Sequence, residues 1–470
     1  PVETSSHPAV GDVNGDGVLD VVLGANYLYV WDAGGVELRD GDGDPQTLGP
    51  FSGLSGDWGP AGVVLANLTA MPGLEIVASY RTGKRIYVYQ GDGSVAPGWP
   101  QTMSNWNWAT PAVGDIDGNG DLEIVVNTID GRIYVWNHDG TEFRDGDGNP
   151  ATVGVFQVRA GETYSFCSPA LADLDGDGGA EIIFGTRYRD TSTVDYMYAL
   201  RHDGTQPAGW PVALTIYGEV VCSPAVGDVD QDGSPEVVFV SENDKLHVLR
   251  SNAAEMAPFP ITFVSNCSSY GVSCPSPALA DFDHDGKLEI VAVSVTNATT
   301  ASIRVVTTGG VDLSGWPRSV VGNSESSPVV ADITGDGELD VLFGIGGGSD
   351  STPNYLYGFR HNGGTVPGFP LVLSGPIRPA PFLTDLDGDG GIDIVYGGWD
   401  LQMHVWDLPS AYLPSRVPWP TFKGNPLRTG VLGQTWVTAV DGWTVTAADA
   451  GGAVALTIAG DGQALEAGPW

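Results

Sequence analysis

Basic residues are scarce in this chain. Of its 470 residues only 20 are Lys or Arg, whereas 58 are Asp or Glu, which gives a formal net charge of −38 at pH 7. So strong a negative charge repels the phosphates of DNA and RNA and the surface of an anionic membrane. We therefore expect no nucleic-acid partner. The acids either bind cations or keep the chain soluble by repulsion.

Long hydrophobic runs and helical patterns are missing as well. No apolar run approaches the about 18 residues that indicate a transmembrane helix. No stretch sustains apolar residues at the i, i+3, i+4, i+7 spacing of a long amphipathic helix. The chain has instead 67 Gly and 33 Pro, with 42% hydrophobic residues. This composition favours an all-β fold of many short strands joined by tight turns.

Cysteine is also rare, and no C-x-x-C pair occurs, which argues against zinc or thioredoxin-like chemistry. The spacing is compatible with disulfides between Cys267 and Cys274 and between Cys167 and Cys222, although four buried thiols are the alternative. Disulfides would indicate export from the cell. The chain begins at Pro1 rather than Met, which is compatible with a processed precursor.

An acidic motif recurs along the whole chain. It reads GDVNGDGVLDVVLG at residues 11–24 and returns six times, beginning at residues 114, 172, 227, 280, 331 and 384. An eighth copy, ANLTAMPGLEIVAS at residues 66–79, keeps the apolar pattern but has lost most of the acids. A proline precedes every copy, and successive prolines lie 51 to 58 residues apart. The repeat is therefore the architecture of the chain.

Each repeat unit predicts four short strands. An apolar strand enters the acidic loop, a β-branched strand leaves it, an alternating aromatic strand such as RIYVWN follows, and a step such as PGWP opens the last strand. Four strands in about 50 residues are typical of a β-propeller blade. We predict an eight-bladed β-propeller over residues 1–433, with a seven-bladed ring as the alternative. Residues 434–470 lack the motif and are expected to form a short β-rich C-terminal extension.

The acidic loop has the spacing Asp-x-Asp-x-Asp-Gly-x-x-Asp/Glu. Alternate side chains in a tight turn aim their oxygens at one point, and a hard cation with six to eight oxygen ligands, such as Ca²⁺, suits such a loop. Without a metal the carboxylates would repel one another and raise each other's pKa. We predict about seven Ca²⁺ sites and none in the second unit, where Asn67, Thr69 and Met71 replace the first three ligands.

The predicted ligands are the residues at positions 1, 3, 5, 7 and 9 of each loop, position 7 acting through its backbone carbonyl. They are Asp12, Asn14, Asp16, Val18, Asp20; Asp115, Asp117, Asn119, Asp121, Glu123; Asp173, Asp175, Asp177, Gly179, Glu181; Asp228, Asp230, Asp232, Ser234, Glu236; Asp281, Asp283, Asp285, Lys287, Glu289; Asp332, Thr334, Asp336, Glu338, Asp340; and Asp385, Asp387, Asp389, Gly391, Asp393. Two insertions, at residues 39–47 and 144–152, are either extra calcium loops or plain turns.

These units resemble the FG-GAP/VCBS calcium-binding repeats of integrin α-chain heads and of many secreted bacterial proteins. The resemblance covers roughly residues 1–433, and PWPTFKGNPLRTG at residues 418–430 resembles the closing segment of such bacterial proteins. It implies an extracellular or cell-surface location, calcium loops between the first and second strands of each blade, and ligand binding on the opposite face. It does not imply one function, because members include adhesion heads, lectin-like binders and eight-bladed rhamnogalacturonan lyases.

No cluster of unlike catalytic groups stands out, so we expect non-enzymatic adhesion or recognition of a glycan or protein. The variable loops expected opposite the calcium loops contain aromatic residues that suit a ligand face or simply cap the barrel: Trp58, Trp106, Trp108, Tyr164, Tyr217 and Tyr270. Two alternatives stay open. The C-terminal strands could assemble the chain into a homo-oligomer, polymer or surface filament, or the propeller could be a polysaccharide lyase.

Overall fold

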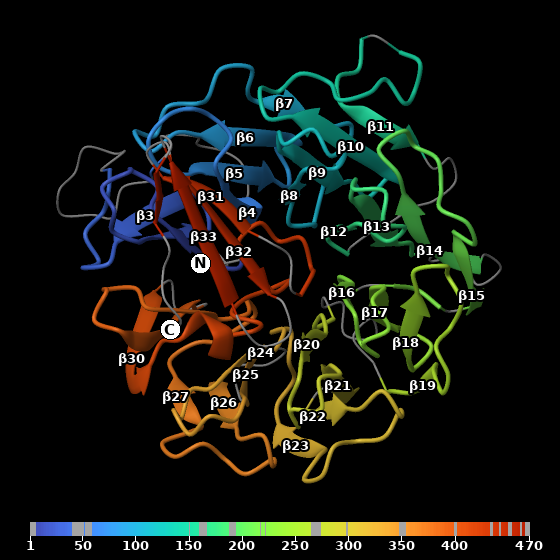
Figure 1. The fold of residues 1–470 in the computed structure, drawn as a ribbon, viewed down its shortest axis with the longest axis vertical. Helices are drawn as coiled ribbons and strands as arrows, with labels where there is room; N and C mark the ends of the chain where they lie inside the picture. The colour runs from blue at the N-terminus through green and yellow to red at the C-terminus, as the bar shows by residue number, and fades with distance from the viewer. Residues whose placement is uncertain are drawn as a thin grey trace.

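A computed structural model describes most of the chain. The described residues are 6–39, 51, 59–149, 151–158, 167–187, 194–216, 218–220, 222–264, 274–297, 299–346, 354–398 and 402–432, together with four strands between residues 436 and 465. Figure 1 shows these residues arranged as sheets around a central axis.

Eight small antiparallel sheets form the ring, in the order of the sequence. The first four blades consist of β1(Ala9–Gly11), β2(Asp20–Gly24) and β3(Leu28–Asp32); β4(Pro60–Ala66), β5(Glu75–Tyr80), β6(Arg85–Tyr89) and β7(Gln101–Thr102); β8(Ala112–Gly114), β9(Glu123–Asn127), β10(Arg132–Asn137) and β11(Val155–Val158); and β12(Ala170–Ala172), β13(Glu181–Gly185), β14(Val194–Leu200) and β15(Val212–Ile216).

The other four blades consist of β16(Ala225–Gly227), β17(Glu236–Ser241), β18(Lys245–Arg250) and β19(Ile261–Thr262); β20(Ala278–Ala280), β21(Glu289–Asn297), β22(Thr300–Val306) and β23(Arg318–Val321); β24(Val329–Ala331), β25(Asp340–Ile345), β26(Asn354–Phe359) and β27(Leu371–Leu373); and β28(Phe382–Thr384), β29(Gly391–Gly397) and β30(Met403–Ala411). Each first strand contacts the first strands of its two neighbours, and β28 contacts β1, so the ring is closed. The predicted eight-bladed propeller is confirmed, and the seven-bladed alternative is wrong.

The blade topology separates the loops into two faces. Within each blade, neighbouring strands are antiparallel and follow the order of the sequence, so consecutive connections alternate between the two ends of the strands. The acidic loops join first to second strands and therefore share one face with the turns between third and fourth strands. The other face holds the loops between second and third strands and the connections from one blade to the next.

Small and large residues alternate around the axis. The first strands of three blades end in glycine, at Gly11, Gly114 and Gly227. A Cβ atom on Gly114 would lie 3.0 Å from Leu171 Cδ1 of the next blade, and one on Gly227 would lie 3.1 Å from Leu279 Cδ1. The leucines occupy the space that a larger residue would fill, and this complementary packing stabilises the inner wall of the ring.

Residues 417–432 cross the centre of the ring, and we name this stretch the plug. Its backbone carbonyls accept hydrogen bonds from the middle residue of five first strands: Val330 N–H to Trp419 O at 2.9 Å, Leu383 to Pro420 at 2.9 Å, Val113 to Leu427 at 3.0 Å, Leu171 to Thr429 at 2.9 Å and Val226 to Gly430 at 2.7 Å. These inner strands otherwise present an unpaired edge to the axis, so the plug satisfies backbone groups of five blades at once.

Two buried basic side chains of the plug bond to carbonyls at the heads of the first strands. Arg428, which is fully buried, donates to Pro8 O at 2.5 Å and to Phe422 O at 2.9 Å. Lys423 Nζ donates to Pro169 O. Because these prolines begin the inner strands, the two side chains tie blades one and four to the plug.

A chain of backbone to side-chain hydrogen bonds links the strand heads of blades three to seven. The N–H of the residue before each strand-head proline donates to the serine hydroxyl of the next blade at 2.9 Å: Thr110 to Ser168, Ser168 to Ser223, Ser223 to Ser276 and Ser276 to Ser327. At the seam between the last and first blades His7 plays this part, because its Nδ1 accepts the Ala380 N–H at 2.8 Å. His7 also stacks on Phe422 of the plug, with 3.8 Å between ring centroids.

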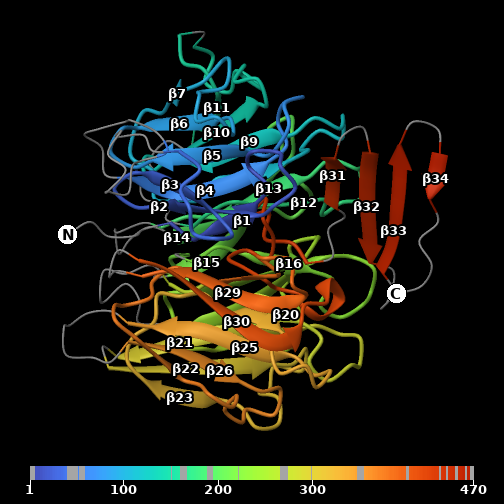
Figure 2. The same cartoon turned by 90° about the vertical axis from the view of Figure 1, so that its left-hand side faces the viewer.

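The C-terminal extension forms a sheet of its own, in the order β31(Trp436–Val440), β32(Trp443–Asp449), β33(Val454–Gly460) and β34(Gln463–Leu465), as Figure 2 shows. Its predicted role in assembly stays a prediction. The short 3-10 helix Pro414–Arg416 (η2) precedes the plug. Among the described residues no helix is long and apolar enough to cross a membrane.

No disulfide joins Cys167 to Cys222, a pairing that the sequence had left open. Both residues are buried thiols, and each sits before a different first strand, where its Sγ accepts a hydrogen bond from the second strand of its own blade: from Gly185 N–H at 3.1 Å and from Val240 N–H at 3.2 Å. Cys274 is a buried thiol too, and Cys267 lies outside the described residues. Cys167 and Cys222 are therefore polar core residues, each within a single blade, as the alternative of buried thiols predicts.

Candidate metal centres

The seven acidic loops share one backbone conformation. In every loop the glycine at position 6 has a positive φ, between 85° at Gly17 and 95° at Gly337. Its N–H donates to the Asp at position 1 over 2.8–3.0 Å, as at Asp12, Asp115, Asp173, Asp228, Asp281, Asp332 and Asp385. Left-handed φ values suit glycine, so the D-G step in the motif fixes the tight turn.

The other side chains are held by the loop backbone in the same way. The N–H at position 7 donates to the side chain at position 5, as at Asp16, Asn119, Asp177, Asp232, Asp285, Asp336 and Asp389. The loops are therefore folded so that several carboxylates point inward together. Whether the position-7 carbonyls of Val18, Asp121, Gly179, Ser234, Lys287, Glu338 and Gly391 ligate a metal stays a prediction.

The acid at position 9 is buried and lies in the second strand, which it begins in every acidic-loop blade except the eighth. One oxygen of the Glu123 carboxylate accepts the Ile116 N–H at 3.0 Å, and the equivalent bond recurs at Asp20, Glu181, Glu236, Glu289 and Asp393. In the seventh blade Asp340 accepts the Thr334 N–H at 3.1 Å instead. Each position-9 acid thus reaches back across its loop.

Several of these buried carboxylates have an oxygen without any hydrogen-bond partner among the described residues. At position 9 these are Asp20 Oδ1, Glu123 Oε1, Glu236 Oε1 and Asp340 Oδ1, and at positions 1 and 3 they are Asp281 Oδ1, Asp385 Oδ1 and Asp230 Oδ1. A buried carboxylate oxygen without a partner is costly, so such atoms normally face a donor or a cation. This donor set of hard, anionic oxygens fits Ca²⁺.

The shifted pKa values of the loop carboxylates also favour a bound cation. Burial raises the pKa of Glu123, Glu181, Glu236 and Glu289 to about 7, and repulsion from the other loop carboxylates adds to the rise. The same causes raise the pKa of Asp20 to about 6 and that of Asp340 to about 7. Burial and mutual repulsion disfavour the ionised form of these carboxylates, and a bound cation stabilises that form.

Five of the seven loops bring three acidic oxygens within 4.8 Å of one another. The groups are Asp115, Asp117 and Glu123; Asp173, Asp175 and Glu181; Asp228, Asp230 and Glu236; Asp281, Asp283 and Asp285; and Asp385, Asp387 and Asp393. In the first and seventh blades position 3 is Asn14 or Thr334, so these loops offer an amide or a hydroxyl in place of a third close carboxylate. We expect these two loops to bind a cation more weakly.

The second blade has an internal substitute for a metal. Glu75, at position 9, accepts hydrogen bonds from Leu68 N–H at 2.7 Å and Thr69 N–H at 3.2 Å on one oxygen, and from the Thr69 hydroxyl on the other. Both carboxylate oxygens are therefore satisfied by the protein, and Met71 at position 5 is 55% exposed. This geometry supports the prediction that the second blade binds no metal.

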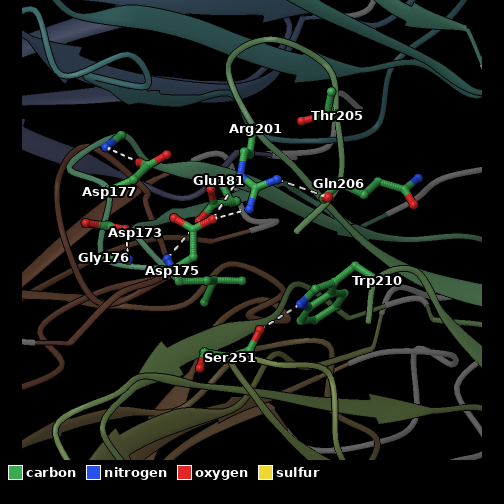
Figure 3. A network of polar contacts seen from close by, with 12 residues as sticks. Asp173, Asp175, Gly176, Asp177, Glu181, Arg201, Thr205, Gln206, Trp210 and Ser251 are labelled. Atoms are coloured by element: carbon green, nitrogen blue, oxygen red, sulfur yellow. Dashed lines mark hydrogen bonds and ion pairs between the residues drawn. The ribbon is translucent and has the colours of Figure 1, made fainter. Parts of the chain in front are cut away.

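Arginines from the ends of third strands reach into several loops, which the sequence analysis missed. Arg201 Nη2 lies 2.5 Å from Asp175 Oδ2, and Figure 3 shows it beside Asp173, Asp177 and Glu181. In the fifth blade, Arg250 bonds to Asp230 and Asp232 of its own blade at 2.6 and 2.7 Å. The signal was present, since YALR and HVLR place an arginine at the same point of two units. Each arginine binds one oxygen of the position-3 Asp and orients the other.

The described part of the second insertion forms a turn. In residues 144–149 the Asp145 carboxylate accepts the Gly148 N–H at 2.6 Å and that of Asp147 accepts the Asn149 N–H at 2.9 Å, which is ordinary turn geometry. The first insertion, with Asp40, Asp42 and Asp44, lies outside the described residues. The aromatic residues Trp58, Tyr164, Tyr217 and Tyr270 also lie outside them.

Solved structures with similar folds are only distantly related to this chain. The biofilm matrix protein Bap1 of V. cholerae has a TM-score of 0.55 at 13% identity, with 88% of this chain and 89% of that chain covered. The Bacillus licheniformis rhamnogalacturonan lyase PL11 has a TM-score of 0.51 at 17% identity, covering 87% and 72%. A europium-containing methanol dehydrogenase has 0.53 at 12%, covering 84% and 83%. At these identities the likeness concerns the fold alone.

No curated protein sequence matches the chain significantly. The model of the FG-GAP-like repeat matches residues 74–126, 173–239 and 228–292. These stretches include the acidic loops of the third, fourth, fifth and sixth blades. The chain therefore contains FG-GAP-like repeats and folds as an eight-bladed β-propeller.

Proposed function

We propose that this chain is an extracellular β-propeller that is stiffened by calcium and recognises a ligand without catalysing a reaction. The observation that supports the calcium part is the set of buried carboxylate oxygens that have no hydrogen-bond partner among the described residues and recur in the loops of six different blades. The fold does not select a function, because proteins with this fold have been named as a matrix protein, a lyase and a dehydrogenase.

Calcium suits these loops better than magnesium. Each loop offers four side chains and a backbone carbonyl in a flexible turn, and Ca²⁺ accepts six to eight oxygens in irregular geometry. Mg²⁺ demands near-ideal octahedral geometry and keeps its water ligands. Loops of this kind, distributed around a ring, do not converge on one substrate, so their role is to hold each first strand to its second strand. Micromolar to millimolar affinity suits calcium outside the cell.

Recognition is assigned to the face opposite the metal loops. The metal-loop face is dominated by acidic turns, whereas the opposite face holds the connections that vary most between blades. Two tryptophans are among the exposed large apolar side chains of the described residues. These two, Trp106 and Trp108, both lie on the face opposite the metal loops. Exposed tryptophans are enriched where proteins bind ligands.

Calorimetry on metal-stripped protein tests the calcium part. We expect Ca²⁺ to bind at about seven sites, one for each acidic loop, and to raise the melting temperature, because a site occupied at 100 times its Kd adds about 2.7 kcal/mol. Excess Mg²⁺ should not replace it. No heat of binding, together with a melting temperature that chelation leaves unchanged, would show the proposal to be wrong.

A further inference from the structure

We propose that a patch on the second and third blades binds a polysaccharide with carboxylate groups, through two tryptophans and the basic side chains around them. The patch consists of Arg81, Lys84, Arg85, Ser104, Trp106, Trp108, Asp130 and Arg132. This inference rests on the proposed function, because it names the ligand class of the face opposite the metal loops.

The patch is built from three loops on one face of two neighbouring blades. Residues 81–84 connect β5 to β6, residues 103–111 lead from β7 to β8, and residues 128–131 connect β9 to β10. Each loop joins either a second strand to a third or one blade to the next. All three therefore lie on the face without metal loops, and Figure 1 shows the two blades side by side.

The loops are held together by direct contacts. Lys84 Nζ donates to Ser104 O at 3.2 Å, and the Ser104 hydroxyl donates to Asp130 Oδ2 at 2.7 Å. The backbone carbonyl of Trp106 accepts the Ile129 N–H at 2.9 Å. Arg132 pairs with Asp130 at 3.4 Å. The first half of the tryptophan loop is thus fixed to both neighbouring loops, so the patch is preorganised.

The two indoles supply an apolar surface in this frame. Trp106 is 43% exposed and Trp108 is 40% exposed, although tryptophan is normally well buried. An indole face packs well against the C–H face of a sugar ring, and its large rigid area costs little conformational entropy on binding. The Arg81 guanidinium lies over Trp108, 3.7 Å from the ring centroid.

The charge of the patch selects the kind of sugar. It holds four of the chain's 20 basic residues and one acid, Asp130, in a protein with a formal net charge of −38. The planar array of N–H donors on a guanidinium matches the geometry of a carboxylate. The local excess of positive charge attracts an anionic polysaccharide to this patch. The negative charge of the rest of the protein surface repels it.

Binding measurements with defined oligosaccharides test this. The probes are hexasaccharides of galacturonate, guluronate and glucuronate-containing hyaluronan, with the fully methyl-esterified galacturonate hexamer as the uncharged match. In Ca²⁺ we expect at least one of the three acidic probes to bind. If galacturonate binds, the methyl ester should bind at least tenfold more weakly, and 0.5 M NaCl should weaken binding.

Variants locate the binding. We expect W106A/W108A and R81Q/K84Q each to lower the affinity at least tenfold, whereas K245Q should leave it unchanged. Lys245 is the matched control because it begins the third strand of the fifth blade, as Arg85 does in the second. The calcium stoichiometry and melting temperature of each variant, compared with the unsubstituted protein, verify that it is folded.

Several results would overturn the proposal. These are no binding of any acidic probe, equal binding of the methyl ester, or unchanged affinity in the tryptophan variant. Tighter binding of a polyglutamate peptide than of every sugar, lost in the same variants, would show the patch to be a protein interface instead. If calcium binds at the acidic loops but no acidic sugar binds, this inference fails while the calcium part of the proposed function stands.

Discussion

The buried acid at position 9 decides how a loop behaves with and without metal. Glu123 has one oxygen bonded to the loop backbone and one without a protein partner, whereas both oxygens of Glu75 in the second blade are bonded. The two side chains are equally buried, at 0% and 2% exposure. They therefore form a natural pair for separating metal binding from folding.

We expect Glu123→Gln to remove one calcium from the stoichiometry and to lower the melting temperature in Ca²⁺. In metal-free protein at pH 8 the same change should raise the melting temperature, because it replaces a buried negative charge by a neutral amide. The measurements are calorimetric titration and thermal unfolding in both conditions.

The control, Glu75→Gln, should keep the stoichiometry and lose about 1–3 kcal/mol of unfolding free energy in both conditions, since an amide cannot accept all the hydrogen bonds of Glu75. A change of stoichiometry in this control would contradict the assignment of the second blade as metal-free.

His7 shows how one residue can have a role that its own repeat does not reveal. It stands in the position before the strand-head proline, where four other blades have serine, and its ring accepts the Ala380 N–H. Burial lowers the pKa of His7 well below its usual value, and the nearby Arg428 charge lowers it further. The neutral ring is therefore the form that closes the seam.

At the scale of elements, the plug ties the ring together. Among the described strands, no blade combines strands from the two ends of the chain. The plug bonds to first strands of five blades through its backbone and to two more carbonyls, those of Pro8 and Pro169, through Arg428 and Lys423. Burial lowers the pKa of Arg428 to about 9 and that of Lys423 well below its usual value. Hydrogen bonds to carbonyls are thus the main compensation for burying these groups.

We expect Arg428→Met to lower the unfolding free energy by about 2–6 kcal/mol, since two buried carbonyls lose a donor and each costs about 1–3 kcal/mol. Urea unfolding in saturating Ca²⁺ measures this. Arg304→Met is the matched control, because its ion pair with Asp312 at 2.7 Å is partly exposed and should contribute less than about 1 kcal/mol. Equal losses in the two variants would mean that the plug does not stabilise the ring.

The sequence predicts what is local and repeated. Eight blades, the strand order and the acidic loops follow from motifs within about 50 residues, because a turn and its two strands are specified by neighbouring residues. Arg428 and Pro8, by contrast, are 420 residues apart, and Arg428 belongs to no repeat. Their contact could not be predicted from spacing, and neither could the arginines that enter the metal loops from third strands. Cys167 and Cys222 occupy matching positions in two repeats, which made a disulfide between them conceivable. Because the two repeats form separate blades, each thiol bonds within its own blade instead.

For the whole molecule, the balance of charge links stability to pH and to metal. Six buried loop acids have pKa values of about 6 to 7: Asp20, Glu123, Glu181, Glu236, Glu289 and Asp340. In the unfolded chain such groups titrate near pH 4. The folded state therefore binds more protons than the unfolded state between about pH 4 and 7, and stability falls as the pH rises through this range.

Two groups oppose this trend. His7 and Lys423 have lowered pKa values when folded, so each contributes stability that is lost as the pH falls below its unfolded pKa. They are two groups against six, so the carboxylates determine the direction between pH 5 and 7.5.

We therefore expect the melting temperature of metal-stripped protein to fall as the pH rises from 5 to 7.5. In saturating Ca²⁺ the trend should reverse, because the cation binds the ionised carboxylates and competes with protons that are fewer at higher pH. The difference between the two melting temperatures should widen steadily with pH, and scanning calorimetry at intervals of half a pH unit measures it. A gap that stays constant with pH would mean that the cation does not bind through these six carboxylates. In Glu75→Gln the gap should widen as it does in the unsubstituted protein, because the second blade takes no part in this linkage.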